Sequence, residues 1–120
     1  MHRIAFVLNK GLGEAGSATR AMQFAGLAAE HGAAVSVILV DDAVHWAQFG
    51  MADGIRSTTG EQMGEMLKKL QACGCAIHVC KACADKRLIA EDDCIPGAQI
   101  TGGGDIVDLM IDPQTKVITF

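Results

Sequence analysis

The chain has 120 residues, of which half are hydrophobic and 20% are charged, with a formal net charge of −4 at pH 7. This length predicts one domain over residues 1–120, with a core large enough to need neither disulfides nor a metal. Nucleic acid is excluded as a partner, because Lys and Arg never form a run longer than two and tyrosine is absent.

The amino-terminal segment and the cysteines predict a cytoplasmic protein. The apolar run at 4–8 is too short for a signal peptide or a membrane span, so no membrane partner is expected. In the cytoplasm most of the five cysteines would stay reduced. The low charged fraction predicts that some apolar surface is buried between the subunits of a homo-oligomer.

The first third of the sequence predicts a strand, a loop, a helix and a second strand. The apolar run at 3–8 has strand length, residues 9–16 form a glycine-rich loop, and Ser17 is a favourable N-cap for an alanine-rich helix at 17–30. The run at 35–40 is rich in β-branched residues. Runs without alternation belong to strands that are covered on both faces, as in parallel sheets.

The middle of the sequence predicts an amphipathic helix. Thr58 or Thr59 can cap it, with Glu61 or Gln62 completing a capping box. From Met63 onward, apolar residues recur at i, i+3, i+4 and i+7, which places them on one helical face.

The other elements continue the alternation of strand and helix. In chain order they are a helical turn at 43–47, a strand at 76–79, a helix at 81–90, a strand at 98–101, a helix opened by residues 102–104, and a closing strand at 116–120. This order predicts a doubly wound α/β fold with five mostly parallel strands. Ligands bind outside the carboxyl ends of such strands, where residues 9–16, 41–46 and 80–83 should converge.

Cys80 is the residue that we expect to carry the chemistry. It ends a strand and begins a helix, where backbone N–H groups and the helix dipole stabilise a thiolate, the reactive form of cysteine. Cys83 follows at Cys-x-x-Cys spacing, so the two sulfurs face one another as in thiol–disulfide enzymes. Lys81 and Arg87 add positive charge nearby. His78 shares a strand face with Cys80, either as a proton partner or as a core histidine.

The four cysteines at 73, 75, 80 and 83 also raise the question of a zinc site. If residues 76–79 form a strand, Cys75 and Cys80 are about 16 Å apart. Zinc–thiolate bonds are about 2.3 Å long, so one ion cannot bridge that distance. The sequence therefore predicts no metal site, and Cys73 and Cys75 are interpreted as packing residues at the opposite edge of the sheet.

The glycine-rich loop matches a dinucleotide-binding pattern. Gly11-x-Gly13-x-x-Gly16 follows a strand and opens a helix, and Asp41 ends the next strand. Glu14 weakens this interpretation, because its charge would lie where a pyrophosphate should bind. A nucleotide- or flavin-binding module therefore stays an alternative, and no cofactor is expected in the main interpretation.

One further likeness concerns a known family. The residues that carry it are Val79-Cys80-Lys81-Ala82-Cys83, Arg87 and the closing strand at 116–120. With them, nearly the whole chain resembles the DsrE/DsrF/TusD (DsrEFH) sulfur-relay family. By this resemblance Cys80 is the cysteine that carries sulfur as a persulfide, and Cys83 corresponds to a second cysteine present in some members. Leu88 stands where the family usually has glycine after the arginine.

The resemblance implies a three-layer, flavodoxin-like, DsrE-like domain that forms trimers or hexamers. It also implies a sulfurtransferase-like carrier that takes sulfur from a donor protein onto Cys80 and passes it to an acceptor protein. Two further alternatives remain beside the nucleotide-binding module. One is a Cys-x-x-Cys thiol–disulfide redox protein, and the other is an oligomeric scaffold without catalysis.

Overall fold

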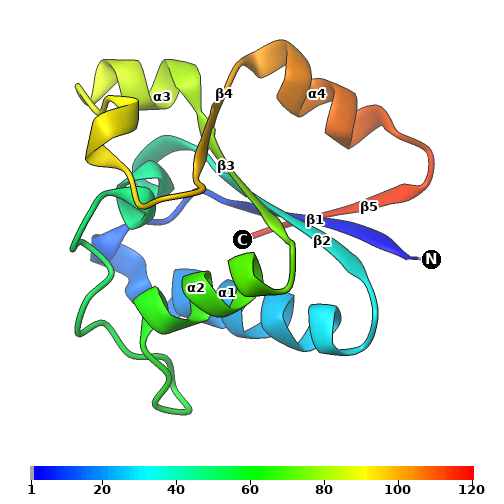
Figure 1. Ribbon diagram of the computed structural model, residues 1–120, viewed down its shortest axis with the longest axis horizontal. Helices are drawn as coiled ribbons and strands as arrows, with labels where there is room; N and C mark the ends of the chain where they lie inside the picture. Colours follow the sequence, from blue (N-terminus) through cyan, green and yellow to red (C-terminus); the bar gives the residue numbers. More distant parts are fainter. Residues whose placement is uncertain (1) are drawn as a thin grey trace.

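The computed structural model describes residues 2–120 and is built around one five-stranded sheet. The strand order is β4-β3-β2-β1-β5, and all neighbouring strands are parallel (Figure 1). The strands are β1 (Arg3–Leu8), β2 (Ala34–Leu39), β3 (Ala76–Cys80), β4 (Gln99–Thr101) and β5 (Thr115–Thr119). The predicted doubly wound parallel sheet is therefore confirmed.

Helices cover both faces of this sheet and make three layers, as predicted. α1 (Ala15–Glu30) and α2 (Met63–Ala72) lie side by side on one face, and α4 (Gly103–Ile111) covers the other (Figure 1). α3 (Lys81–Lys86) follows β3 directly and packs beside the 3-10 segment η2 (Asp41–Ala47). Two shorter 3-10 turns complete the elements, η1 (Leu12–Glu14) and η3 (Glu91–Asp93).

The central strands are buried on both faces, and β1 shows how the core divides. Phe6 and Leu8 belong to the larger core beneath α1 and α2. Ala5 and Val7 belong to a smaller core, to which α4 contributes Ile106. Because both faces are apolar, the strand reads as a continuous hydrophobic run rather than an alternating one.

α1 begins at Ala15 with Glu14 as its N-cap, so the predicted start at Ser17 was wrong. The turn η1 leads the chain straight into the helix, and the backbone is already helical at Ser17. Small buried side chains such as Ala21 and Ala25 let the helix lie close to the sheet. Among the residues described, no helix has both the length and the apolar character needed to cross a bilayer.

α2 begins at Met63, and neither Thr58 nor Thr59 caps it, contrary to prediction. The Thr59 hydroxyl donates to the carboxylate of Glu61 instead. The Ser57 hydroxyl accepts a 3.2 Å hydrogen bond from the backbone N–H of Glu61. These side chains therefore close a turn before the helix.

α3 ends at Lys86, although the sequence predicted a helix to residue 90. Leu88 stops it by adopting a left-handed backbone conformation with φ of 59°. The N–H of Ile89 then bonds back to the Ala84 carbonyl at 2.9 Å. Leucine is an unfavourable residue for this conformation, which glycine adopts without strain.

Leu88→Gly should therefore raise the free energy of unfolding by about 0.5–1 kcal/mol. A leucine in the left-handed region costs about 1–2 kcal/mol, and the greater freedom of glycine in the unfolded chain offsets part of the gain. The Leu88 side chain is 89% exposed, so little packing is lost. Urea unfolding with an unchanged m-value measures the effect. Leu88→Ala is the control, because it keeps the strained φ; an equal gain in that variant would contradict the backbone explanation.

Candidate functional site

The candidate site lies at the carboxyl edge of the sheet, where the three predicted segments meet. Cys80 is the last residue of β3 and the N-cap of α3. η2 continues from β2 and packs against α3 and η1. The indole N–H of the fully buried Trp46 donates to the Lys10 carbonyl at 2.8 Å, which fixes η2 to the glycine-rich loop.

The cysteine pair is half-buried, and Cys83 contacts Asp41 from η2. The Cys83 thiol donates to the carboxylate Oδ1 of Asp41 at 3.8 Å. Burial is the main factor that raises the pKa of Cys83, and the neighbouring Cys80 and the Asp41 carboxylate raise it further. The backbone N–H of Asp41 opposes them. Cys83 therefore tends to keep its proton near neutral pH.

Arg87 ties α3 to η2 beside this pair. Its guanidinium donates to the Cys83 carbonyl at 3.1 Å and to the carboxylate of Asp42 at 2.9 Å. The hydrogen bond and charge of Arg87 lower the pKa of Asp42. The positive charge predicted near the thiols is therefore present, but Asp42 balances much of it. Sequence reasoning missed Asp42, whose only signal was its position beside Asp41 in a segment that enters the site.

Lys81 does not add an unpaired charge to the site. Its ammonium group pairs with Asp85 one helical turn later, at 2.8 Å, and both side chains are exposed. The helix dipole behind Cys80 is also weaker than predicted, because α3 has only six residues. Local contacts therefore contribute more to the chemistry of the pair than the sequence suggested.

His78 is half-buried and bonded to β4. Its Nδ1 lies 2.8 Å from the Thr101 hydroxyl, which itself donates to the Gln99 carbonyl at 3.2 Å. The hydroxyl proton is thus committed, so Nδ1–H is the donor to Thr101 and the lone pair is on Nε2. Burial lowers the pKa of His78 and favours the neutral imidazole. This arrangement fits a hydrogen-bonded histidine between two strands, and it keeps a basic nitrogen on the strand face of Cys80.

The lowered pKa of His78 predicts a specific loss of stability in acid. Below about pH 6.5 the unfolded chain takes up a proton that the folded chain resists, so the free energy of unfolding should fall as pH falls. His78→Gln keeps a hydrogen-bond donor for Thr101 and should make the free energy of unfolding depend less on pH in this range. Denaturant unfolding from pH 7.5 to 5 measures it. His31→Gln, which replaces an exposed histidine after α1, should keep the wild-type pH dependence of the free energy of unfolding. An equal pH dependence in the two variants would contradict its attribution to His78.

The glycine-rich loop forms an open polar hollow at the same edge. Its lining consists of Asn9, Lys10, Gly11, Gly13, Glu14, Asp41 and Asp42. Three of these are carboxylates, and the one lysine pairs with Glu14 at 3.8 Å. Gly11 is needed for packing, because a Cβ there would lie 2.7 Å from the Asp42 carbonyl oxygen. The contacts of Gly11 and Asp41 are therefore explained without a nucleotide, and the acidic lining disfavours a pyrophosphate.

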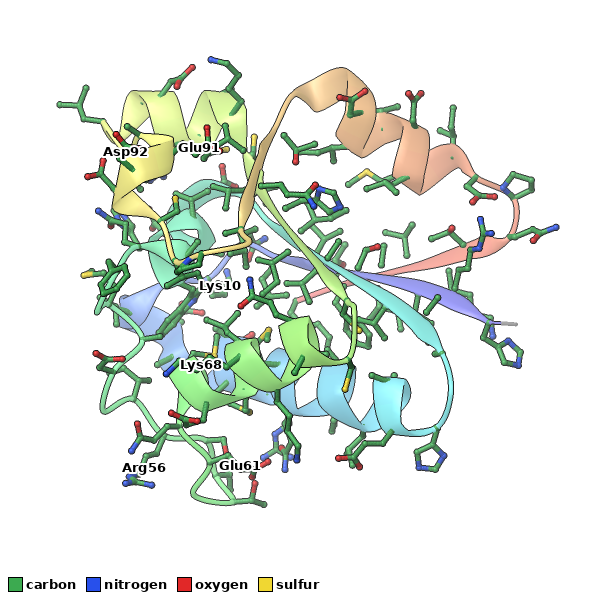
Figure 2. The ribbon with its side chains drawn as sticks, viewed as in Figure 1. Lys10, Arg56, Glu61, Lys68, Glu91 and Asp92 are labelled. Atoms are coloured by element: carbon green, nitrogen blue, oxygen red, sulfur yellow. The ribbon has the colours of Figure 1, made fainter. Side chains whose placement is uncertain are left out.

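Two groups of the charged side chains labelled in Figure 2 lie on different sides of the molecule. Glu91 and Asp92 lie in the segment after α3, at the upper left of Figure 2. Arg56 and Glu61 lie at the lower left, in the loop that extends beyond the layer of α1 and α2 (Figure 2).

The remaining cysteines lie away from the pair or are inaccessible. Cys75 immediately precedes β3, at the opposite end of the strand from Cys80, as predicted. Cys73 is exposed at the carboxyl end of α2, which ends at Ala72, and this corrects its interpretation as a packing residue. Cys94 is buried. Within residues 2–120, no group of three or more His, Cys, Asp or Glu side chains is arranged to hold a metal ion.

Comparison with solved structures shows the same fold in two proteins, and each match covers both chains completely. The YchN protein of E. coli superposes with a TM-score of 0.86 at 24% identity, over 100% of both chains. MTH1491 of Methanobacterium thermoautotrophicum, a protein of unknown function, superposes with a TM-score of 0.73 at 16% identity, also over 100% of both chains.

Sequence comparison gives a more specific result. Curated proteins yielded no match. The model of the DsrE/DsrF-like family, in contrast, matches residues 2–120, which is nearly the entire chain. The chain belongs to the DsrE/DsrF-like family.

Proposed function

We propose that this protein is a sulfur carrier that accepts sulfur as a persulfide on Cys80 and passes it to a thiol of a partner protein. The observation that carries the proposal is the place of Cys80, between β3 and α3 at the carboxyl edge of a DsrE-type sheet. The raised pKa of Cys83 supports Cys80 as the nucleophile of the pair. The acidic lining next to the pair favours sulfur over a nucleotide as the cargo.

The transfer itself needs no cofactor. The Cys80 thiolate attacks the outer sulfur of a donor persulfide, a new bond forms between the two sulfurs, and the donor leaves as a thiolate. In the second step an acceptor thiolate attacks the outer sulfur on Cys80, and Cys80 leaves as the thiolate. Electrons balance in both steps, so no external oxidant or reductant is needed.

Mass spectrometry of the persulfide-loaded protein tests the proposal. We expect a gain of about 32 Da, the mass of one sulfur atom, after incubation with a low-molecular-weight persulfide. Peptide mapping after alkylation should place it on Cys80. A matched sample whose thiols are alkylated before loading should show no gain. Sulfur found mainly on the exposed Cys73 would overturn the proposal, because that thiol lies outside the site.

We also propose that the partners include further copies of this chain, as a trimer or a hexamer. β5 is an edge strand, and exposed apolar side chains lie on it and on the helices of both sheet faces. They are Phe24 and Leu27 on α1, Val107 and Ile111 on α4, and Val117 and Ile118 on β5. A surface of this kind is typical of a contact between subunits. A cytoplasmic location is proposed as well, since all five cysteines are unpaired.

Ile118→Lys should reduce this assembly. The substitution places a charge among the exposed apolar side chains of the edge strand β5, and buried unpaired charges strongly oppose association. Light scattering should give several times the monomer mass of 12.6 kDa for the wild type and a smaller mass for the variant. Leu88→Lys changes an equally apolar exposed residue beyond α3 and should leave the mass unchanged. A monomeric wild type at micromolar concentration would contradict the proposal.

A further inference from the structure

Cys83 is surrounded by groups with opposing effects on its ionisation. Asp41 contacts it twice, through a carboxylate 3.8 Å from the sulfur and through its backbone N–H. The Cys80 side chain also interacts with the Cys83 thiol, and the Arg87 guanidinium donates a hydrogen bond to the Cys83 carbonyl. Arg87 is itself paired with Asp42. The Asp41 carboxylate is therefore the carboxylate that contacts the Cys83 thiol, whereas Arg87, which interacts with the charges of both, is hydrogen-bonded to Asp42.

We infer that the Asp41 carboxylate, together with burial, protects the sulfur carried on Cys80 by holding Cys83 as a thiol. Asp41 is thus a positioning residue that acts through Cys83, and this role rests on the proposed function. It answers a problem that the Cys-x-x-Cys spacing creates, because a second thiol next to a persulfide can discharge it.

The reaction that must be prevented is internal and needs no other reactant. A Cys83 thiolate would attack the inner sulfur of the persulfide, which is the Sγ of Cys80. A Cys80–Cys83 disulfide would form, the bond between inner and outer sulfur would break, and the outer sulfur would leave with the electron pair as hydrosulfide. The carried sulfur would then be lost to solvent. Only the thiolate attacks, so a protonated Cys83 leaves the persulfide intact.

The backbone at Asp41 supports this specific assignment. Asp41 has a φ of 49°, in the left-handed region that few residues other than glycine, asparagine and aspartate adopt readily. This conformation directly follows the extended Val40 and begins η2, from which the carboxylate contacts Cys83. Asparagine fits the same backbone conformation, so Asp41→Asn removes the charge without a change of shape. It also keeps the backbone N–H that favours the thiolate.

Asp41→Asn should shorten the life of the persulfide on Cys80. We expect a severalfold increase in the rate of hydrosulfide release, in proportion to the thiolate fraction of Cys83. Sulfide release after loading with a low-molecular-weight persulfide measures the rate, and mass spectrometry should find the Cys80–Cys83 disulfide as the second product. The double variant Asp41→Asn with Cys83→Ser should release sulfide no faster than Cys83→Ser alone.

A second measurement separates electrostatics from a merely structural effect. The pH profile of Cys83 alkylation, measured without any sulfur donor, should move to lower pH in Asp41→Asn, because loss of the negative charge lowers the pKa of Cys83. Glu65→Gln, which removes the same charge from the exposed face of α2, should leave both the profile and the sulfide release unchanged. Equal profiles and equal sulfide release in wild type and Asp41→Asn would overturn the role of Asp41. A wild type that never forms a persulfide on Cys80 would overturn the proposed function instead.

Discussion

Trp46→Ala should lower the free energy of unfolding by about 3–5 kcal/mol. The side chain is fully buried in η2, and its indole N–H donates to the Lys10 carbonyl at 2.8 Å. Alanine would leave a large cavity and would deprive that carbonyl of its partner. A protein of this size has a total stability of about 5–15 kcal/mol, so the variant should approach the limit of folding.

Trp46→Phe separates the loss of the indole hydrogen bond from the loss of packing. Phenylalanine restores most of the ring volume but has no N–H, so we expect a loss of about 1–3 kcal/mol, mainly from the unpaired Lys10 carbonyl. Urea unfolding of both variants at pH 7.5 gives the comparison. Equal losses in the two variants would show that the hydrogen bond, rather than the packing, holds η2 to the loop. A loss below 1 kcal/mol for alanine would contradict the described burial of Trp46.

The fold was predictable from the sequence because its strands are covered on both faces. In β1 and β2, continuous apolar runs have one simple interpretation, and the parallel sheet follows from it. The helix starts were less predictable, since hydroxyl side chains close turns as readily as they cap helices. Thr59 bonds to Glu61 within a turn, and Ser17 lies inside α1.

The candidate site was predictable only in part. The position of Cys80 between strand and helix follows from local sequence, and the structure has this junction. The contact between Cys83 and Asp41 does not, because it joins residues from different elements through the unusual backbone of Asp41. The glycine pattern instead assigned Asp41 to a nucleotide. Patterns of single residues thus predicted the strand–helix junction at Cys80, whereas the charged groups around the cysteine pair could be placed only from the three-dimensional arrangement.

Cys80→Ser should abolish sulfur transfer, and Cys83→Ser should leave it largely intact. The two substitutions form a matched pair, because each replaces a half-buried sulfur with oxygen within one short stretch of chain. Serine does not ionise near pH 7, so the Cys80→Ser variant would lack the proposed nucleophile. We expect loss of more than about a hundredfold in transfer rate, which is a typical effect of removing a nucleophile. Transfer of labelled sulfur from a loaded donor to an acceptor thiol measures the rate.

Cys83→Ser distinguishes the sulfur carrier from a dithiol redox enzyme. A carrier needs only one thiol, and the raised pKa of Cys83 makes it a poor second nucleophile at neutral pH. Transfer should therefore continue at close to the wild-type rate, with a persulfide that lasts as long or longer. A dithiol enzyme needs Cys83 to resolve the adduct on Cys80, so the same substitution would trap that adduct and stop turnover. A trapped Cys80 adduct together with lost turnover would identify the protein as a redox enzyme, in which the Asp41 carboxylate would slow resolution by Cys83.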